Sequence, residues 1–137
     1  MLDASERTVC DCAACSRHCL TQPGMLAVGD LQRIAKRLGT DAAGKFVPSR
    51  GALARVRSTR ALVRIPTITP ARKPDGSCIF LTAEGRCSIH DIAPAGCAFF
   101  DSHMLDEEAN RRSSIIHGEI MGSPEYAMQR ASLAGEV

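Results

Sequence analysis

The cysteines of this chain fall into two closely spaced groups, and this clustering narrows the possible folds more than any other property. The first group has the pattern C-x-C-x2-C-x3-C and the second has the pattern C-x8-C-x9-C. In order, the seven residues are Cys10, Cys12, Cys15 and Cys19, then Cys78, Cys87 and Cys97. Thiols packed so closely cannot all pair with one another without strain, because bridged Cα atoms need a separation of about 4.4 to 6.8 Å. The spacing therefore favours a shared metal centre over disulfides.

The expected compartment supports the same choice. The first residues, MLDASERTVCDC, contain no apolar run that could act as a signal peptide. We therefore expect a cytoplasmic protein, and reducing systems in the cytoplasm keep thiols from forming disulfides. In that setting a dense cysteine set, here odd in number, indicates metal binding or redox activity. No stretch approaches about 18 consecutive apolar residues, so no membrane span is expected.

The number and spacing of the thiols bear on the metal. Four sulfur atoms complete either a structural zinc site or a cubane cluster. Six or seven cysteine ligands therefore exceed the number that one mononuclear site can use. The run Cys12-x2-Cys15-x3-Cys19 has the close spacing of ferredoxin-like cluster loops, although no proline follows it directly. Only Cys12 and Cys15 form the C-x2-C pair that is common in zinc sites. We expect an iron-sulfur cluster or more than one metal, with a single zinc as the alternative.

Charge is distributed unevenly along the chain. Residues 42–74 hold eight basic residues and no acidic one, whereas seven acids and three arginines lie from Asp101 onward. The basic residues are Lys45, Arg50, Arg55, Arg57, Arg60, Arg64, Arg72 and Lys73. Such a segment can bind nucleic acid or an acidic partner, or it can be a solvated face that balances the acidic C-terminal segment. Because no aromatic residues alternate with its arginines, it lacks a stacking platform, and nucleic-acid binding is not the expected role.

Turn residues and apolar periodicity divide the chain into short elements. A helix is predicted to begin at Asp30, which can cap it, and to stop at Gly39. Residues 51–60 can form a less well-marked helix, and residues 61–69 become β-rich. Pro66 restricts that β segment to an edge strand.

The clearest β feature predicted is a hairpin over residues 74–90, which would bring Cys78 close to Cys87. Beyond Cys97, a helix capped by Asp101 or Ser102 is predicted to end at Gly122. Its expected apolar stripe consists of Leu105, Ala109, Ile116 and Ile120. A final helix is predicted to begin at Ser123-Pro124, in the usual order of cap and proline. The predicted fold is one small α+β domain over residues 1–137, irregular and metal-centred, with a short β-hairpin and three or four helices.

Three parts of the sequence together resemble the YkgJ family of cysteine-cluster proteins. They are the N-terminal cluster CDCAACSRHC, the segment PGMLAVGDL, and the pattern C-I-F-L-x3-G-R-C-S-I-H-x3-P-x2-C. The family is described as a zinc- or iron-chelating domain, and the resemblance runs from Cys10 to about His103.

The resemblance implies two ligand sets, which are Cys12, Cys15 and Cys19, and Cys78, Cys87 and Cys97. Cys10 looks like an addition to the common pattern. Similar sequences often have tyrosine at the position of His90, so the resemblance implies a packing role there, and we retain His90 only as a possible ligand. His103 lies six residues after Cys97 and could also approach the centre.

Three functions compete on these grounds. The leading prediction is a metal-binding accessory protein or small subunit that docks on a larger enzyme or maturation factor. The alternatives are a soluble electron-transfer protein and a zinc-stabilised nucleic-acid-binding module that uses residues 45–73. No phosphate-binding loop, nucleophile elbow or dinucleotide fingerprint is present, and a Cys97–His103 pair is nonspecific among seven cysteines, so we do not expect an enzyme.

Overall fold

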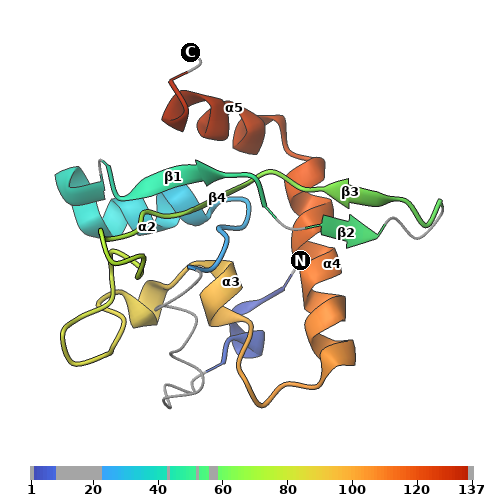
Figure 1. The fold of residues 1–137 in the computed structure, drawn as a ribbon, viewed down its shortest axis with the longest axis horizontal. Helices are drawn as coiled ribbons and strands as arrows, with labels where there is room; N and C mark the ends of the chain where they lie inside the picture. Colours follow the sequence, from blue (N-terminus) through green and yellow to red (C-terminus); the bar gives the residue numbers. More distant parts are fainter. Residues whose placement is uncertain (1, 9–22, 43, 52, 56–58, 136–137) are drawn as a thin grey trace.

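The computed structural model describes residues 2–8, 23–42, 44–51, 53–55 and 59–135. Within these ranges, helices and short antiparallel strands form a small α+β fold, as predicted (Figure 1). The elements, in chain order, are the 3-10 helix Ala4–Glu6, α2 (Asp30–Leu38), the 3-10 helix Gly39–Ala42, β1 (Phe46–Ser49), β2 (Leu53–Arg55), β3 (Leu62–Arg64), β4 (Thr67–Pro70), the 3-10 helix His90–Ile92, α3 (Ala95–Ala98), α4 (Asp106–Met121) and α5 (Pro124–Leu133).

The four strands make one long antiparallel hairpin in two halves. β1 pairs with β4 in the inner half, and β2 pairs with β3 in the outer half. The outer half projects from the body of the protein at the right of Figure 1, whereas the inner half lies beneath α5. The predicted β-rich segment 61–69 is thus confirmed as β3 and β4, with Pro66 between them.

A bulge separates the two halves of the hairpin. Between the Ser49–Thr67 and Leu53–Arg64 pairs, one strand has three residues and the other has two. Gly51 lies in the longer stretch with φ of +75°, and a Cβ there would come within 1.7 Å of the Ile65 carbonyl oxygen. Only glycine fits this close approach, because any side chain would collide with backbone. The helix predicted over residues 51–60 is wrong, because strand pairing with residues 62–64 overrides the local helical preference.

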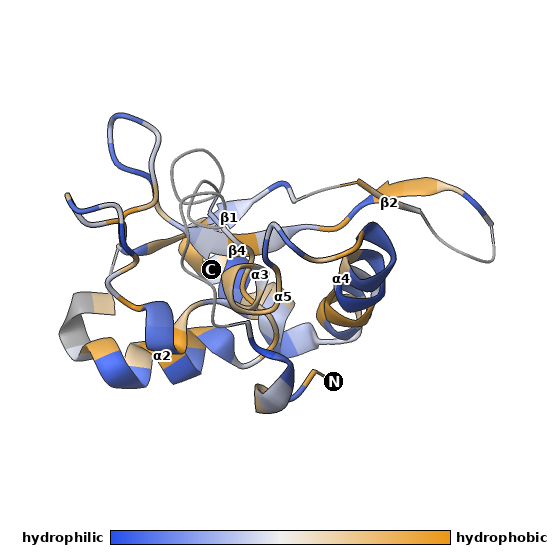
Figure 2. Cartoon of the chain, turned by 90° about the horizontal axis from the view of Figure 1, so that it is seen from below, coloured by the Kyte–Doolittle hydropathy of each residue, from blue (hydrophilic) through white to orange (hydrophobic). Residues whose placement is uncertain are grey.

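The core lies between the inner half of the hairpin and the surrounding helices. Ile34 of α2, Ile68 of β4 and Ile116 of α4 are almost completely buried in it. Phe46 and Phe80 add an aromatic contact, with ring centroids 5.7 Å apart. Figure 2 shows hydrophilic and hydrophobic residues alternating along α2, as expected of a helix with one buried face. The helix predicted from Asp30 to Gly39 is confirmed, although Gly29 takes the capping position.

The last two helices follow the predicted order. α4 ends at Gly122, and the hydroxyl of Ser123 accepts a hydrogen bond from the Tyr126 amide at 3.1 Å, which caps α5. Ile116 and Ile120 are buried as predicted. The start of α4 was predicted too early, because the helix begins after Leu105 rather than at Asp101 or Ser102. Leu105 is 78% exposed and does not belong to the buried stripe.

The region predicted as a hairpin over residues 74–90 consists of two successive turns. Its only ladder contacts in the described chain are single bridges, which join Arg72 to Cys78 and Leu81 to Cys87. Asp75 stabilises the first turn, since its carboxylate accepts hydrogen bonds from the amide and hydroxyl of Ser77 at 2.9 and 2.6 Å. These two bonds lower the pKa of the Asp75 carboxyl. In the described ranges, no helix has the length and apolar character needed to cross a bilayer.

Candidate metal centre

Cys97 lies in the one-turn helix α3, which the buried Pro94 precedes. The Cys97 amide donates to the Pro94 carbonyl oxygen at 2.9 Å, and its side chain is half-buried. A short helix of this kind cannot hold its position by its own hydrogen bonds. Its surroundings therefore determine where the Cys97 thiol lies.

The strongest constraint on α3 is a glycine-to-glycine contact with the segment that follows the first cysteine group. The Gly96 amide donates to the Met25 carbonyl oxygen at 2.8 Å. A Cβ on Gly24 would come within 2.6 Å of the Cys97 Sγ atom, and a Cβ on Gly96 would come within 2.3 Å of the Met25 amide nitrogen. The Cys97 sulfur therefore lies close to the Gly24 backbone, in a contact that tolerates no side chain at either glycine.

A second contact ties the other flank of the first cysteine group to α3. The Thr8 amide donates to the Ala98 carbonyl oxygen at 2.7 Å. Thr8 precedes Cys10 by two residues, and Gly24 follows Cys19 by five. Both flanks of the segment that carries the first four cysteines are thus held against the turn that carries Cys97.

Asp30 links α2 to the same turn. Its carboxylate is buried and accepts hydrogen bonds from the amides of Ala27 at 2.8 Å and Ala95 at 2.9 Å. Arg33 donates to the same carboxylate at 3.2 Å, and also to the carbonyl oxygens of Ile92 and Ala93. The sequence marked Asp30 only as a helix start, and nothing in the local sequence indicates its bond to residue 95.

α4 fixes the far end of α3 and the N-terminal turn. The guanidinium of Arg112 donates to the carbonyl oxygens of Glu6 and Phe99, the latter at 3.0 Å. Glu108 accepts hydrogen bonds from Arg111 and Arg112, and these two arginines lower the pKa of the Glu108 carboxyl to about 2. Arg111 also forms an ion pair with Glu6 at 2.9 Å. The N-terminal turn, α3 and α4 therefore form one connected frame.

Cys78 and Cys87 lie in the two turns that follow β4. Cys78 is buried, and its carbonyl oxygen accepts a hydrogen bond from the Leu81 amide at 3.0 Å. Cys87 is half-buried and bridges to the same Leu81. Cys78 and Cys87 thus both contact the backbone of Leu81, Cys78 through a turn and Cys87 through an antiparallel bridge. Cys78, Cys87 and Cys97 form no disulfides with one another.

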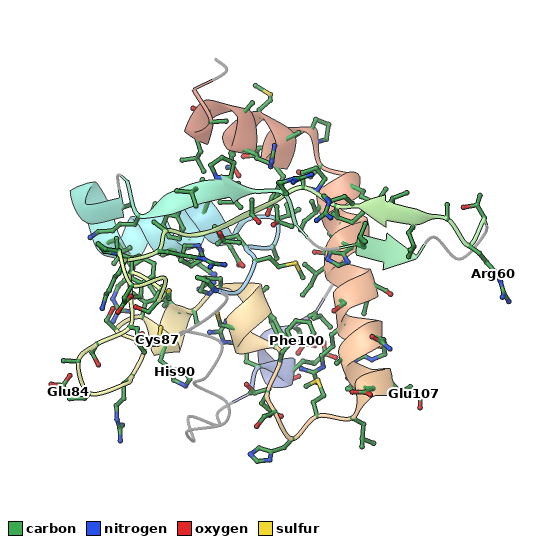
Figure 3. The ribbon with its side chains drawn as sticks, in the orientation of Figure 1. Arg60, Glu84, Cys87, His90, Phe100 and Glu107 are labelled. Carbon is green, nitrogen blue, oxygen red and sulfur yellow. The ribbon has the colours of Figure 1, made fainter. Side chains whose placement is uncertain are left out.

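The two candidate histidines are exposed. His90 begins a 3-10 helix, and its amide donates to the Cys87 carbonyl oxygen at 3.3 Å. Figure 3 shows His90 beside Cys87, to the left of α3. The His103 amide donates to the Asp101 carboxylate at 2.9 Å in the loop before α4. These backbone bonds fix the turns that carry the two imidazoles.

The described ranges bring together only part of the predicted ligand set. Within them, no three side chains of histidine, cysteine, aspartate or glutamate are grouped so as to hold a metal ion. The predicted ligands Cys10, Cys12, Cys15 and Cys19 lie outside the described residues. The thiolate donors of the sequence fit zinc and iron-sulfur clusters by chemical type.

A cavity of about 580 Å3 lies beside the Gly24–Gly96 contact. Ser113 and His117 on one face of α4 line it opposite Thr67 and Thr69 of β4. Figure 3 shows Phe100, another lining residue, between α3 and α4. Burial lowers the pKa of His117. Sequence reasoning did not single out His117, because this residue has no neighbouring candidate ligand along the chain.

Comparison of the chain with family models, with curated proteins and with solved structures finds no match. The resemblance to the YkgJ family accordingly stays a prediction from its cysteine patterns.

Proposed function

We propose that this chain is a YkgJ-like, metal-binding accessory protein whose cysteines hold an iron-sulfur cluster or zinc. The first cysteine group and Cys97 would supply ligands to one centre, and Cys78 and Cys87 would complete it or form a second. Such a centre would act in the cytoplasm, where thiols stay reduced. Its role would be to support a larger enzyme or maturation factor, rather than to catalyse a reaction of its own.

The observation that carries this proposal is the double attachment of the first cysteine segment to the Cys97 turn. Thr8 is bonded to Ala98 at one flank, and Met25 is bonded to Gly96 at the other. A chain spans at most about 3.6 Å per residue, so the tether from Thr8 to Cys10 is no longer than about 7 Å. Ligands from distant parts of a sequence can share a metal only when the fold brings their segments together. These two hydrogen bonds hold the flanks of the first cysteine segment against the turn that carries Cys97.

The surroundings of Cys97 support the same role. Cys97 is half-buried and its sulfur lies close to the Gly24 backbone, which suits a ligand held in place by the fold. When bound, a zinc ion or cluster would contribute ligation energy to a small core that has few aromatic residues. The residues of this chain bind the thiol segments together, limit access of water and fix the turn geometry.

The experiment is to determine metal and acid-labile sulfide, with a visible spectrum, on protein purified without oxygen and without a metal-affinity column. Iron with sulfide and a broad absorption band would support a cluster, and zinc without colour would support a structural centre. Replacing Cys15 or Cys87 with serine should each abolish stoichiometric loading, whereas Cys10→Ser should be milder. Equal metal content in all three variants, or none in the native chain, would reject the proposal.

A further inference from the structure

The outer half of the hairpin, formed by β2 and β3, has one face packed on the protein and one face open. Ala54 and Val63 are opposite each other in the register, and both are half-buried and pack against the core. Leu53 pairs with Arg64 on the other face, and Leu62 shares that face because it is two residues from Arg64. We call Leu53, Leu62 and Arg64 the ribbon face.

The ribbon face exposes apolar side chains that the fold does not cover. Leu53 is 55% exposed and Leu62 is 56% exposed, whereas Ala54 and Val63 on the opposite face touch the core. Figure 2 shows the ribbon projecting from the helices, with hydrophobic colour along its strands. Two leucines at diagonal positions on one face of a projecting ribbon form a patch that a partner can bury.

The same ribbon is strongly basic. It lies within the 42–74 segment, which has eight basic residues and no acid. In the described ranges, neither Arg50 nor Arg64 forms an ion pair, and both side chains are exposed. Arg64 is instead held across the bulge by its bond to the Gly51 carbonyl oxygen at 2.8 Å. The positive charge of Arg64 is therefore held at the bulge.

The backbone of the ribbon can also pair with another strand. β2 and β3 form a two-stranded sheet, so each strand has one edge that no other described strand covers. An uncovered edge is a template for strand addition, in which backbone hydrogen bonds give affinity and alternate side chains give specificity.

We propose that this ribbon docks an extended segment of a partner protein that presents apolar and acidic side chains on the same face. The apolar residues of that segment would cover Leu53 and Leu62, and its carboxylates would lie near Arg50 and Arg64. This inference deepens the proposed accessory role, because it states the chemistry of the partner, but it does not depend on which metal is bound.

Charge and apolar pattern favour this occupant over three others. A second copy pairing through the same ribbon would place two basic segments side by side. A bilayer would require apolar residues in the segment between β2 and β3, where the sequence is Val56-Arg57-Ser58-Thr59-Arg60. Nucleic acid would use the arginines but leave the two leucines without a matching surface, and the ribbon has no aromatic residue for stacking.

The test uses fluorescence anisotropy with the complete chain and a labelled peptide, Thr-Leu-Thr-Glu-Thr-Leu-Thr-Glu, in which leucine and glutamate share one face of an extended strand. A peptide with lysine in place of every glutamate is the charge-reversed probe. The acidic peptide should bind at least about tenfold more tightly than the lysine peptide, and raising the salt from about 0.05 M to about 0.3 M should weaken it.

Two variants separate the apolar and charged contributions. Leu53→Thr combined with Leu62→Thr keeps strand preference and charge, and Arg50→Glu reverses one exposed charge. Each should weaken binding of the acidic peptide about tenfold. The matched controls are Met128→Thr on α5 and Lys36→Glu on α2, which make the same kinds of change at exposed sites elsewhere. Both controls should bind as the native chain does.

Four results would overturn the docking proposal. They are equal binding of the two peptides, unchanged binding by either ribbon variant, tighter binding of a DNA duplex or of phosphatidylserine vesicles, and self-association that the ribbon variants abolish. Metal content is measured on the same samples. Loss of peptide binding with full metal loading would reject the docking surface alone, and absence of metal with intact peptide binding would reject the metal centre alone.

Discussion

The buried carboxylate of Asp30 joins segments that are 65 residues apart in the chain. Replacing Asp30 with alanine would leave the part-buried amide of Ala27 and the buried amide of Ala95 without their acceptor, and it would remove the charge partner of Arg33. We predict a loss of about 3 kcal/mol in the free energy of unfolding, measured by denaturant titration. The exposed Asp91, which pairs with Arg37, is the control, and Asp91→Ala should cost no more than about 0.5 kcal/mol. Similar losses for the two variants would contradict the role of Asp30.

Two glycines provide a matched test of the contact that holds Cys97. Gly96→Ala would place a Cβ against the Met25 backbone, whereas a Cβ on Gly118 of α4 meets nothing within 4 Å. We predict that Gly96→Ala lowers both stability, by about 2 kcal/mol or more, and metal content. Gly118→Ala should leave metal content unchanged and raise stability by about 0.5 kcal/mol, since it removes a helix-interior glycine. Normal metal loading in Gly96→Ala would mean that the glycine contact does not position the centre.

The local sequence identifies only some of the residues that hold the helices and the Cys97 turn in place. Asp30 and Gly39 follow known rules of helix termini, so the helix between them was predictable. The Gly24–Gly96 contact and the Asp30–Ala95 bond join positions more than 60 residues apart, and neither residue pair has a local signature. The cysteine spacing predicted which residues would hold a metal, but not that Cys97 lies against the flanks of the first group.

At the scale of secondary structure, Tyr126 fastens α5 to the hairpin. Its hydroxyl donates to the Leu26 carbonyl oxygen and accepts from the Ile68 amide, both at 2.8 Å. Burial raises the pKa of Tyr126 from 10.0 to about 12. Because the folded-state pKa is the higher one, this contribution to stability is complete below pH 10 and is lost as the pH rises toward 12.

The tyrosine titration is directly observable, because Tyr126 is the only tyrosine and the chain has no tryptophan. Ultraviolet absorbance of tyrosinate should show ionisation near pH 12 in the native chain and near pH 10 in denaturant. Ionisation near pH 10 in both states would show that the hydroxyl is not buried between α5 and β4.

The elements differ in how far the sequence determined them. The start of α5 was predictable because Ser123 and Pro124 form a standard N-terminal cap. The Tyr126 amide donates to the Ser123 hydroxyl, as expected for such a cap. The segment 51–60 was predicted as a less well-marked helix, and its alanine, leucine and arginine residues do favour one locally. In the fold, part of this segment pairs with residues 62–64, and Gly51 lies against the Ile65 carbonyl oxygen. Helix propensity is a local property and cannot predict these tertiary contacts.

At the scale of the whole molecule, Glu108 and its partners Arg111 and Arg112 connect α4, α3 and the N-terminal turn. We call these three residues the Glu108 cluster, and its ion pairs should make the fold sensitive to acid. Arg111 and Arg112 hold the pKa of Glu108 at about 2, below its ordinary value of 4.5. The ion pairs therefore contribute above pH 4.5 and are lost as the pH falls toward 2. Urea midpoints measured across this range should fall less steeply for Glu108→Gln than for the native chain. The exposed neighbour Glu107→Gln is the control, and identical profiles for all three proteins would contradict the prediction.

The chain as a whole is organised so that α2, α4 and both flanks of the first cysteine group meet at the turn that carries Cys97. The most direct check of this arrangement is the metal content per chain of Cys97→Ser against the native protein, both purified without oxygen and confirmed as folded by circular dichroism. We predict stoichiometric metal in the native chain and a loss of loading in Cys97→Ser. Equal metal content in the two proteins would contradict the proposal that Cys97 and the first cysteine group share a centre.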